Sequence, residues 1–113
     1  MTRQEQREDA RKDLRASLEK SLVPEHIHAG IISYSVDRVP PGHFLKSVFQ
    51  NDLYKSLGYA DEANRRAIGD IVGFIYAELP DECWGDESTY YRWITTKEVD
   101  DGEDTNWAKF DRL

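Results

Sequence analysis

The sequence predicts an all-α protein, a compact four- to five-helix bundle with a short acidic C-terminal tail. Three observations lead to this prediction. Apolar residues recur every three or four positions in several stretches, which is the spacing of a helix face. Prolines separate these stretches, at Pro24, Pro40, Pro41 and Pro80. The 113 residues fit a single domain, and 39% of them are hydrophobic, which is enough to build a core.

Residues 1–21 are expected to form a charged N-terminal helix. The chain from Arg3 to Lys20 has no glycine or proline, and apolar residues recur at every fourth position from Ala10 to Leu22. A helix with so narrow an apolar stripe is marginal alone. It is therefore expected to pack against its own domain or against a second copy of the chain.

Residues 22–97 are expected to form the helical bundle domain. Its first helix opens at Pro24, because proline suits the first helical position, and it stops before Pro40. The next helix is expected to run from Pro41 to a C-terminal stop at Gly58. The apolar residues that share one face of this second helix are Phe44, Leu45, Val48, Phe49, Leu53 and Leu57.

A central helix is expected between Asp61, its N-cap, and Pro80. Gly69 and Gly73 fall inside it, although a glycine in a helix interior costs about 0.5–1 kcal/mol relative to alanine. The close approach of a neighbouring helix is the expected reason for both glycines. Asp86 is expected to cap a short last helix that is rich in aromatic residues.

Residues 98–113 are expected to form an acidic tail with little fixed structure in its first half. The tail closes with Trp107, Phe110 and Leu113, which follow one another in steps of three and would share one helical face. Such a segment either docks into an apolar groove of a partner or folds back on its own bundle.

The net charge of −7 is concentrated in the last third of the chain, since residues 78–113 hold four basic and eleven acidic residues. This distribution argues against direct nucleic-acid binding through a basic face. It favours solubility or a basic surface on a partner protein. No apolar run approaches the roughly 18–20 residues of a membrane span. Together with the single cysteine, these features predict a soluble protein of the cytoplasm.

The predicted partner-binding residues are acids on both sides of residue 97 and the apolar residues that close the tail. They are Asp81, Glu82, Asp86, Glu87, Asp100, Asp101, Glu103, Asp104, Trp107, Phe110 and Leu113.

Histidines and the cysteine offer the alternative of a metal-dependent or enzymatic protein. The residues concerned are His26, His28, His43 and Cys83. Two histidines that lie two positions apart point to different sides of a helix, whereas metal-binding pairs usually lie three or four apart. The sequence has no glycine-rich phosphate loop, nucleophile elbow or zinc motif of the H-E-x-x-H type. We therefore assign no catalytic residue, cofactor or metal from the sequence.

Several short motifs occur in an order that resembles a known group of proteins. They are Pro24-x-His26-x-His28, Val39-Pro40-Pro41-Gly42-His43-Phe44-Leu45, Asn51-Asp52-Leu53, Ala60-Asp61 with Asn64, and Cys83-Trp84-Gly85. Over roughly residues 22–95 this pattern resembles a group of small uncharacterised phage and prophage proteins. The resemblance implies a phage context, and with it the cytoplasm of a bacterial host cell, and no particular reaction. It does not extend to the N-terminal helix or to the acidic tail.

Asn51 and Asp52 are the motif residues that a helix interior does not need, because both types prefer caps and turns. With His43 they are predicted to form a polar contact surface. The functional hypothesis is a phage-derived accessory protein that binds a host or phage protein, as an inhibitor of a host nucleic-acid-binding or defence protein. A self-associating structural protein is a further alternative, with a homodimer formed through Leu14, Leu18 and Leu22 or through the face of Gly69 and Gly73.

Overall fold

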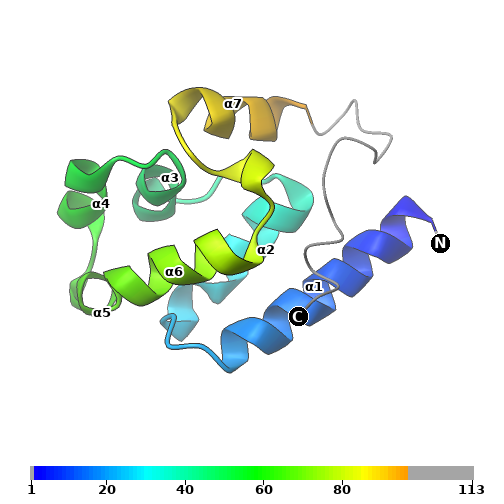
Figure 1. The fold of residues 1–113 in the computed structure, drawn as a ribbon, viewed down its shortest axis with the longest axis horizontal. Coiled ribbons are helices and arrows are strands. Elements are labelled where there is room, and N and C mark those ends of the chain that lie inside the picture. Colours follow the sequence, from blue (N-terminus) through cyan, green and yellow to red (C-terminus); the bar gives the residue numbers. More distant parts are fainter. Residues whose placement is uncertain (1, 97–113) are drawn as a thin grey trace.

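The computed structural model describes residues 2–96, and every regular element in that range is a helix. The all-α prediction is thus confirmed, while the number of α-helices in the described range is seven rather than four or five (Figure 1). The predicted acidic tail lies outside the described residues. The elements are α1 (Arg3–Glu19), a 3₁₀ turn η1 (Glu25–Ile27), α2 (His28–Asp37), α3 (His43–Phe49), α4 (Leu53–Tyr59), α5 (Glu62–Arg66), α6 (Ile68–Glu78), a second 3₁₀ turn η2 (Asp81–Cys83) and α7 (Glu87–Thr95).

The helix predicted from Pro41 to Gly58 is in fact two helices, α3 and α4. Asn51 takes up a left-handed backbone conformation with φ of 60°, which ends the first helix. Asp52 then caps α4, because its carboxylate accepts a hydrogen bond of 3.0 Å from the backbone N–H of Lys55. Asparagine and aspartate tolerate such turns better than other residues, which is why the break falls here. Gly58 lies inside α4 and is not its stop.

The break changes which apolar residues are buried. Phe44, Leu45 and Phe49 of α3 enter the core, whereas Leu53 and Leu57 of α4 are exposed to solvent. The prediction of one continuous apolar face was therefore wrong. A helical period relates residues within one helix, and the turn at Asn51 gives α4 a new direction.

The central helix is also divided, at Ala67, into α5 and α6. Asp61 caps α5 as predicted, with its carboxylate 2.8 Å from the backbone nitrogen of Asn64. The expected close approach at Gly69 and Gly73 was wrong, because no atom of a neighbouring element lies within 4 Å of where a Cβ would stand at either position.

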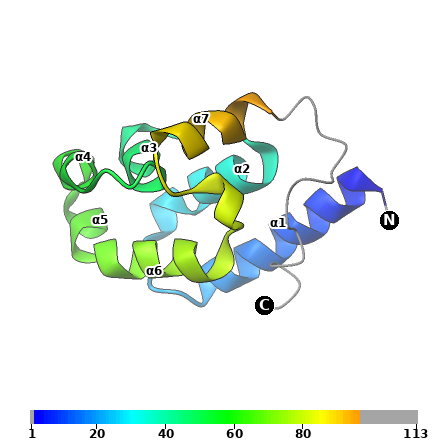
Figure 2. The same cartoon turned by 45° about the horizontal axis from the view of Figure 1, so that its top comes forward.

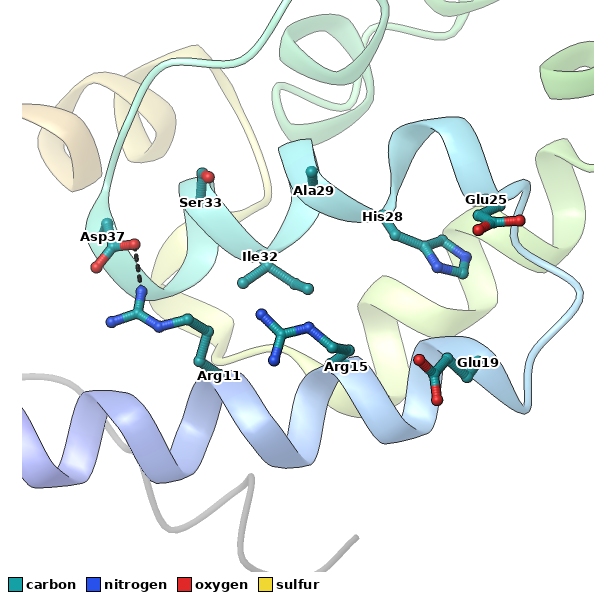
Figure 3. A pocket seen from close by; sticks show the side chains of 9 residues that line it. All are labelled: Arg11, Arg15, Glu19, Glu25, His28, Ala29, Ile32, Ser33 and Asp37. Carbon is teal, nitrogen blue, oxygen red and sulfur yellow. Dashed lines mark hydrogen bonds and ion pairs between the residues drawn. The ribbon is translucent and has the colours of Figure 1, made fainter.

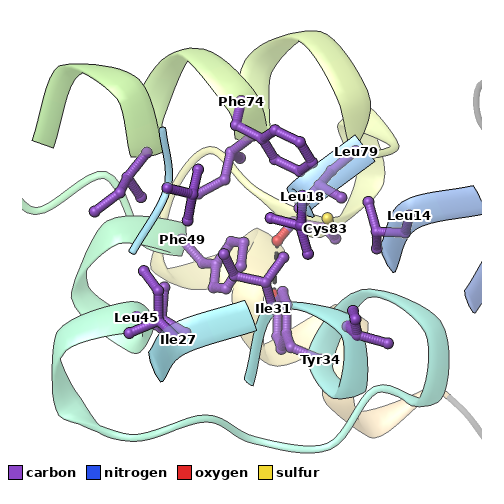
Figure 4. Packing of buried hydrophobic residues seen from close by; sticks show 14 of the residues in the cluster. Leu14, Leu18, Ile27, Ile31, Tyr34, Leu45, Phe49, Phe74, Leu79 and Cys83 are labelled. Carbon is purple, nitrogen blue, oxygen red and sulfur yellow. Dashed lines mark hydrogen bonds between the residues drawn. The ribbon is translucent and has the colours of Figure 1, made fainter. Parts of the chain in front are cut away.

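Helix α1 packs against α2 in the same chain. Its Ala10, Leu14 and Leu18 are buried in the common core, so this helix packs against its own domain. Figure 4 shows Leu14 and Leu18 among the other core side chains. Leu22, the last residue of the predicted stripe, is exposed because α1 ends at Glu19. The first bundle helix begins with the 3₁₀ turn η1 after Pro24 and becomes α-helical only at His28.

Tyr34 of α2 is fully buried at the centre of the core and contacts three other elements. Its ring stacks on Phe49 of α3 and Tyr90 of α7, with centroid distances of 4.1 and 5.5 Å. Its hydroxyl donates a hydrogen bond of 2.6 Å to the carbonyl of Cys83 in η2. Burial raises the pKa of Tyr34 far above its usual value, so this hydroxyl remains a donor at any physiological pH.

Arg38 joins the end of α2 to α7. It has a left-handed conformation with φ of 60° and ends α2 two residues before Pro40. Its guanidinium lies 3.7 Å from the ring centroid of Trp93, and Nη1 donates to the Thr96 hydroxyl at 2.6 Å. The Trp93 indole N–H in turn donates to the Tyr34 carbonyl at 2.8 Å. Helix α7 is therefore attached to α2 by stacking and by hydrogen bonds together.

We predict that Tyr34→Phe lowers the free energy of unfolding by about 1 kcal/mol, because it removes a buried hydrogen bond and keeps the ring stacking. Urea denaturation at neutral pH measures the effect. Tyr54→Phe is the matched control, since Tyr54 is largely exposed, and its unfolding midpoint should equal that of the unmodified protein. Equal midpoints for both variants would contradict the central role of the Tyr34 hydroxyl.

Candidate functional site

Helix α4 carries its apolar residues on the outside of the molecule. Four large apolar side chains, which are Leu53, Tyr54, Leu57 and Tyr59, are between 37% and 89% exposed. The one buried residue of α4 is Ser56, whose hydroxyl donates to the carbonyl of Asp52 at 2.7 Å. The orientation is thus opposite to that of a normal surface helix, which buries its apolar side. We call these four residues the α4 face.

Helix α4 packs mainly against α3 and lies at the end of the molecule away from the N-terminus of α1 in both ribbon views (Figures 1 and 2). Leu53, Tyr54 and Leu57 share one side of α4, whereas Tyr59 lies on another side, where its ring stacks on His43. Exposed apolar residues that share a side mark interaction sites more often than single ones, which are common on any protein surface.

The three residues of the predicted polar contact surface surround this helix. Asn51 and Asp52 form the turn that precedes it. The His43 ring stacks on Tyr59 with a centroid distance of 5.0 Å. Asn51 and Asp52 thus stand at the start of α4, and His43 lies against its last residue. The turn and the cap account for Asn51 and Asp52 locally.

The predicted acidic contact residues that the structure describes are exposed. Asp81 and Glu82 lie in η2, and Asp86 and Glu87 stand at the start of α7. The carboxylate of Asp86 caps α7, since it accepts a hydrogen bond of 2.7 Å from the backbone N–H of Thr89. That hydrogen bond lowers the pKa of Asp86 below 3.8. The remaining predicted contact residues, from Asp100 to Leu113, lie outside the described residues.

Histidines and the cysteine are not gathered into one site. The His26 ring pairs with the Asp61 carboxylate at 2.8 Å, and the His28 ring bonds to the carbonyl of Val23 at 2.8 Å. Cys83 is fully buried in the core. Among residues 2–96, no group of three or more histidine, cysteine, aspartate or glutamate side chains has a geometry that could hold a metal ion.

A groove of about 370 Å³ lies between α1 and α2, close to His28. Figure 3 shows Arg11 and Arg15 extending from α1 toward α2, with Asp37 at one end of the groove. Arg11 already pairs with Asp37 at 2.6 Å. Glu19 and Glu25 also line the groove, so three carboxylates stand beside two guanidinium groups. Because the groove carries charges of both signs, it would not select an anion over a cation or the reverse.

A second pocket, of about 300 Å³, lies between the start of α2, α3 and α5. His26 and His43 both line it, although no spacing in the sequence relates these two residues. Asn64 also lines it, and sequence reasoning assigned that residue no role beyond its place in a motif.

Comparison of the chain with protein-family models, with curated proteins and with solved structures gives no match. The resemblance to phage proteins therefore remains a prediction that rests on the quoted motifs. Within residues 2–96, none of the helices combines the length and the apolar character that crossing a bilayer requires.

Sequence reasoning missed the α4 face. The sequence pattern predicts that Leu53 and Leu57 share one helix face with Phe44 and Phe49, and it assigns no role to Tyr54 and Tyr59. One signal could have revealed the face, namely the pair Asn51-Asp52 in the middle of an otherwise helical pattern. A turn at that pair separates the apolar residues before it from those after it.

We predict that the helix caps make the protein less stable in acid. Hydrogen bonds from Asn64 and Thr89 lower the pKa values of Asp61 and Asp86 below 3.8, and the pairing with His26 also favours ionised Asp61. A carboxyl group whose pKa is lower in the folded protein than in the unfolded chain stabilises the fold. This stabilisation is complete above the pKa of the unfolded chain and is lost as the pH falls through the pKa of the folded protein.

The unfolding midpoint in urea should therefore be steady near neutrality and fall below about pH 4. Asparagine also caps helices but does not titrate, so the double variant Asp61→Asn with Asp86→Asn should show a shallower fall. Asp70→Asn, which removes a carboxylate that is not an N-cap, should keep the full fall. Identical acid profiles for the double variant and the unmodified protein would contradict the role of these caps.

Proposed function

We propose that this protein acts by binding another protein and that the α4 face is the centre of the contact. The observation that carries the proposal is the outward orientation of four large apolar side chains on one short helix. Two of the four, Tyr54 and Tyr59, are tyrosines, which are common among the residues that contribute most to binding energy at interfaces. Burying such a face against a partner would be favourable at about 25 cal/mol per Å² of apolar surface.

A seven-residue helix is too small for a whole interface, which commonly buries about 800 Å² on each partner. The contact must therefore extend onto the neighbouring residues. His43, Asn51 and Asp52 stand beside α4 and would supply its polar rim.

The proposed partner has an apolar groove with basic residues around it. The net charge of −7, which is concentrated in residues 78–113, supports a partner with a basic surface because opposite charges speed the encounter of two proteins. The resemblance to phage proteins supports a phage-derived accessory protein as the biological setting. A host nucleic-acid-binding or defence protein would offer such a basic surface, and occupying that surface would inhibit it.

We predict that Tyr54→Ala weakens binding of a captured partner by about tenfold or more, with little change in stability, because the side chain is 89% exposed. The partner is first isolated from lysates of phage-infected and uninfected bacteria, and its affinity is then measured with purified proteins. Tyr76→Ala is the matched control, since Tyr76 is 69% exposed on α6 and should leave the affinity unchanged.

Equal affinity for Tyr54→Ala and the unmodified protein would refute the role of the α4 face. A chain ending at Lys97 tests the acidic tail separately, and full binding by this truncated chain would place the contact on residues 2–96. Affinity that does not fall between low and high salt would contradict electrostatic attraction.

Self-association is a second candidate, favoured by the open face of α6. No atom of a neighbouring element lies within 4 Å of where a Cβ would stand at Gly69 or Gly73. Val72 and Tyr76, on the same helix, are exposed. Of the alternative interface residues Leu14, Leu18 and Leu22, the first two are buried in the core of the same chain and Leu22 is exposed, so the α6 face is the better candidate.

We predict that, if α6 forms a homodimer, Gly73→Glu restores a monomer without unfolding the protein, because the site is open. Light scattering over a range of concentrations measures the mass. A monomer at every concentration in the unmodified protein would remove this candidate.

A further inference from the structure

Helix α1 carries a row of four arginines along one side. Arg3, Arg7, Arg11 and Arg15 recur at every fourth position, and residues with this spacing stand one above the other on a helix. We call these four residues the arginine row. Like charges four positions apart repel one another, so the row lowers the stability of α1 unless anionic groups lie beside it.

The helix dipole makes the position of the row still less favourable. The N-terminus of a helix carries a partial positive charge, so basic residues are favourable in the last turn and unfavourable in the first. Helix α1 has the reverse arrangement, since Arg3 stands in its first turn and its last turn holds no basic residue. An anionic segment beside the N-terminal half of α1 would offset both effects.

The acids of α1 itself are poorly placed to balance this half of the row. Glu5 belongs to the capping box, where its carboxylate accepts a hydrogen bond of 2.7 Å from the backbone N–H of Thr2. Asp9 falls on the opposite side of the helix. The sequence places no acid three or four positions from Arg3 or Arg7, which are the positions that meet on a helix surface. The complementary charge must therefore come from another segment.

The described part of the chain ends near this row. The hydroxyl of Thr96 accepts a hydrogen bond of 2.6 Å from Nη1 of Arg38. Asp37, the chain neighbour of Arg38, pairs with Arg11 of the row at 2.6 Å. Both ribbon views place the end of α7 and the N-terminal half of α1 on the side of the molecule away from α4 (Figures 1 and 2). The residues that follow Thr96 thus begin near the middle of α1.

Residues 98–104 supply the complementary charge. Five of these seven residues are acidic and none is basic. Asp104 follows Thr96 by eight residues, and eight residues can span up to about 26–29 Å. The helix between Arg3 and Arg15 is only about 18 Å long, at about 1.5 Å for each residue. The acidic run is therefore long enough to lie along the row.

We propose that residues 98–104 dock on the arginine row of the same chain, mainly at Arg3 and Arg7. Guanidinium groups donate strong, charge-assisted hydrogen bonds to carboxylates, which suits this pairing. The groove between α1 and α2 is not part of the contact, because the three carboxylates that line it would repel the run. A partner with a basic surface would compete with α1 for the acidic run. That consequence rests on the proposed function, whereas the docking itself does not.

Backbone amide chemical shifts of the full chain test the docking. The comparison variant keeps the length of the run and removes its charge, through Glu98→Gln, Asp100→Asn, Asp101→Asn, Glu103→Gln and Asp104→Asn. Amide signals between Arg3 and Arg11 should shift in this variant while those of α4 stay in place. High salt should move the same signals in the unmodified protein.

Unchanged α1 signals, or changes that centre on another helix, would overturn the proposal. Changes that depend on protein concentration would assign the contact to a second copy of the chain and would overturn docking within one chain.

The combination of Arg3→Gln with Arg7→Gln tests the row itself. Glutamine is a good helix former, so α1 should stay folded. Removing the charge of the run should lower the urea midpoint of the unmodified protein, but not that of this double variant, because the two changes remove the same contact. Lys12→Gln is the matched control, since Lys12 is exposed on the other side of α1, and it should keep the full loss. Equal losses in the double variant and the control would refute the contact.

Discussion

The fold depends on the buried side chain of Tyr34. In a chain of short helices no single pair of helices offers enough apolar surface to fix the whole arrangement. Tyr34 answers this need because its ring stacks between Phe49 and Tyr90 while its hydroxyl bonds to the carbonyl of Cys83. One residue of α2 thereby fixes the positions of α3, η2 and α7. The indole of Trp93, which donates to the carbonyl of the same tyrosine, closes the arrangement on the α7 side.

The same constraint explains why so much apolar surface remains outside. The residues around Tyr34 fill the core from α1, α2, α3, α6 and α7 (Figure 4). Helix α4 contributes only Ser56 to the buried set, so its leucines and tyrosines have no core to enter. In the proposed function, a partner protein would cover these side chains.

His43 stands between two features of the structure. It lines the pocket between α2, α3 and α5, and its ring stacks on Tyr59, which belongs to the α4 face.

The sequence by itself determined the helical class, the stripe of α1 and the caps at Asp61 and Asp86, because periodicity and capping are local properties of the chain. It did not determine which faces are buried. A helical period says which residues share a side, and only the packing of helices says whether that side meets a neighbour or solvent. The left-handed turn at Asn51 sent Leu53 and Leu57 outward, and the arrangement around α6 left Gly69 and Gly73 open. The meeting of His26, His43 and Asn64 in one pocket was likewise decided by the tertiary structure, since no local rule relates three residues on three separate elements.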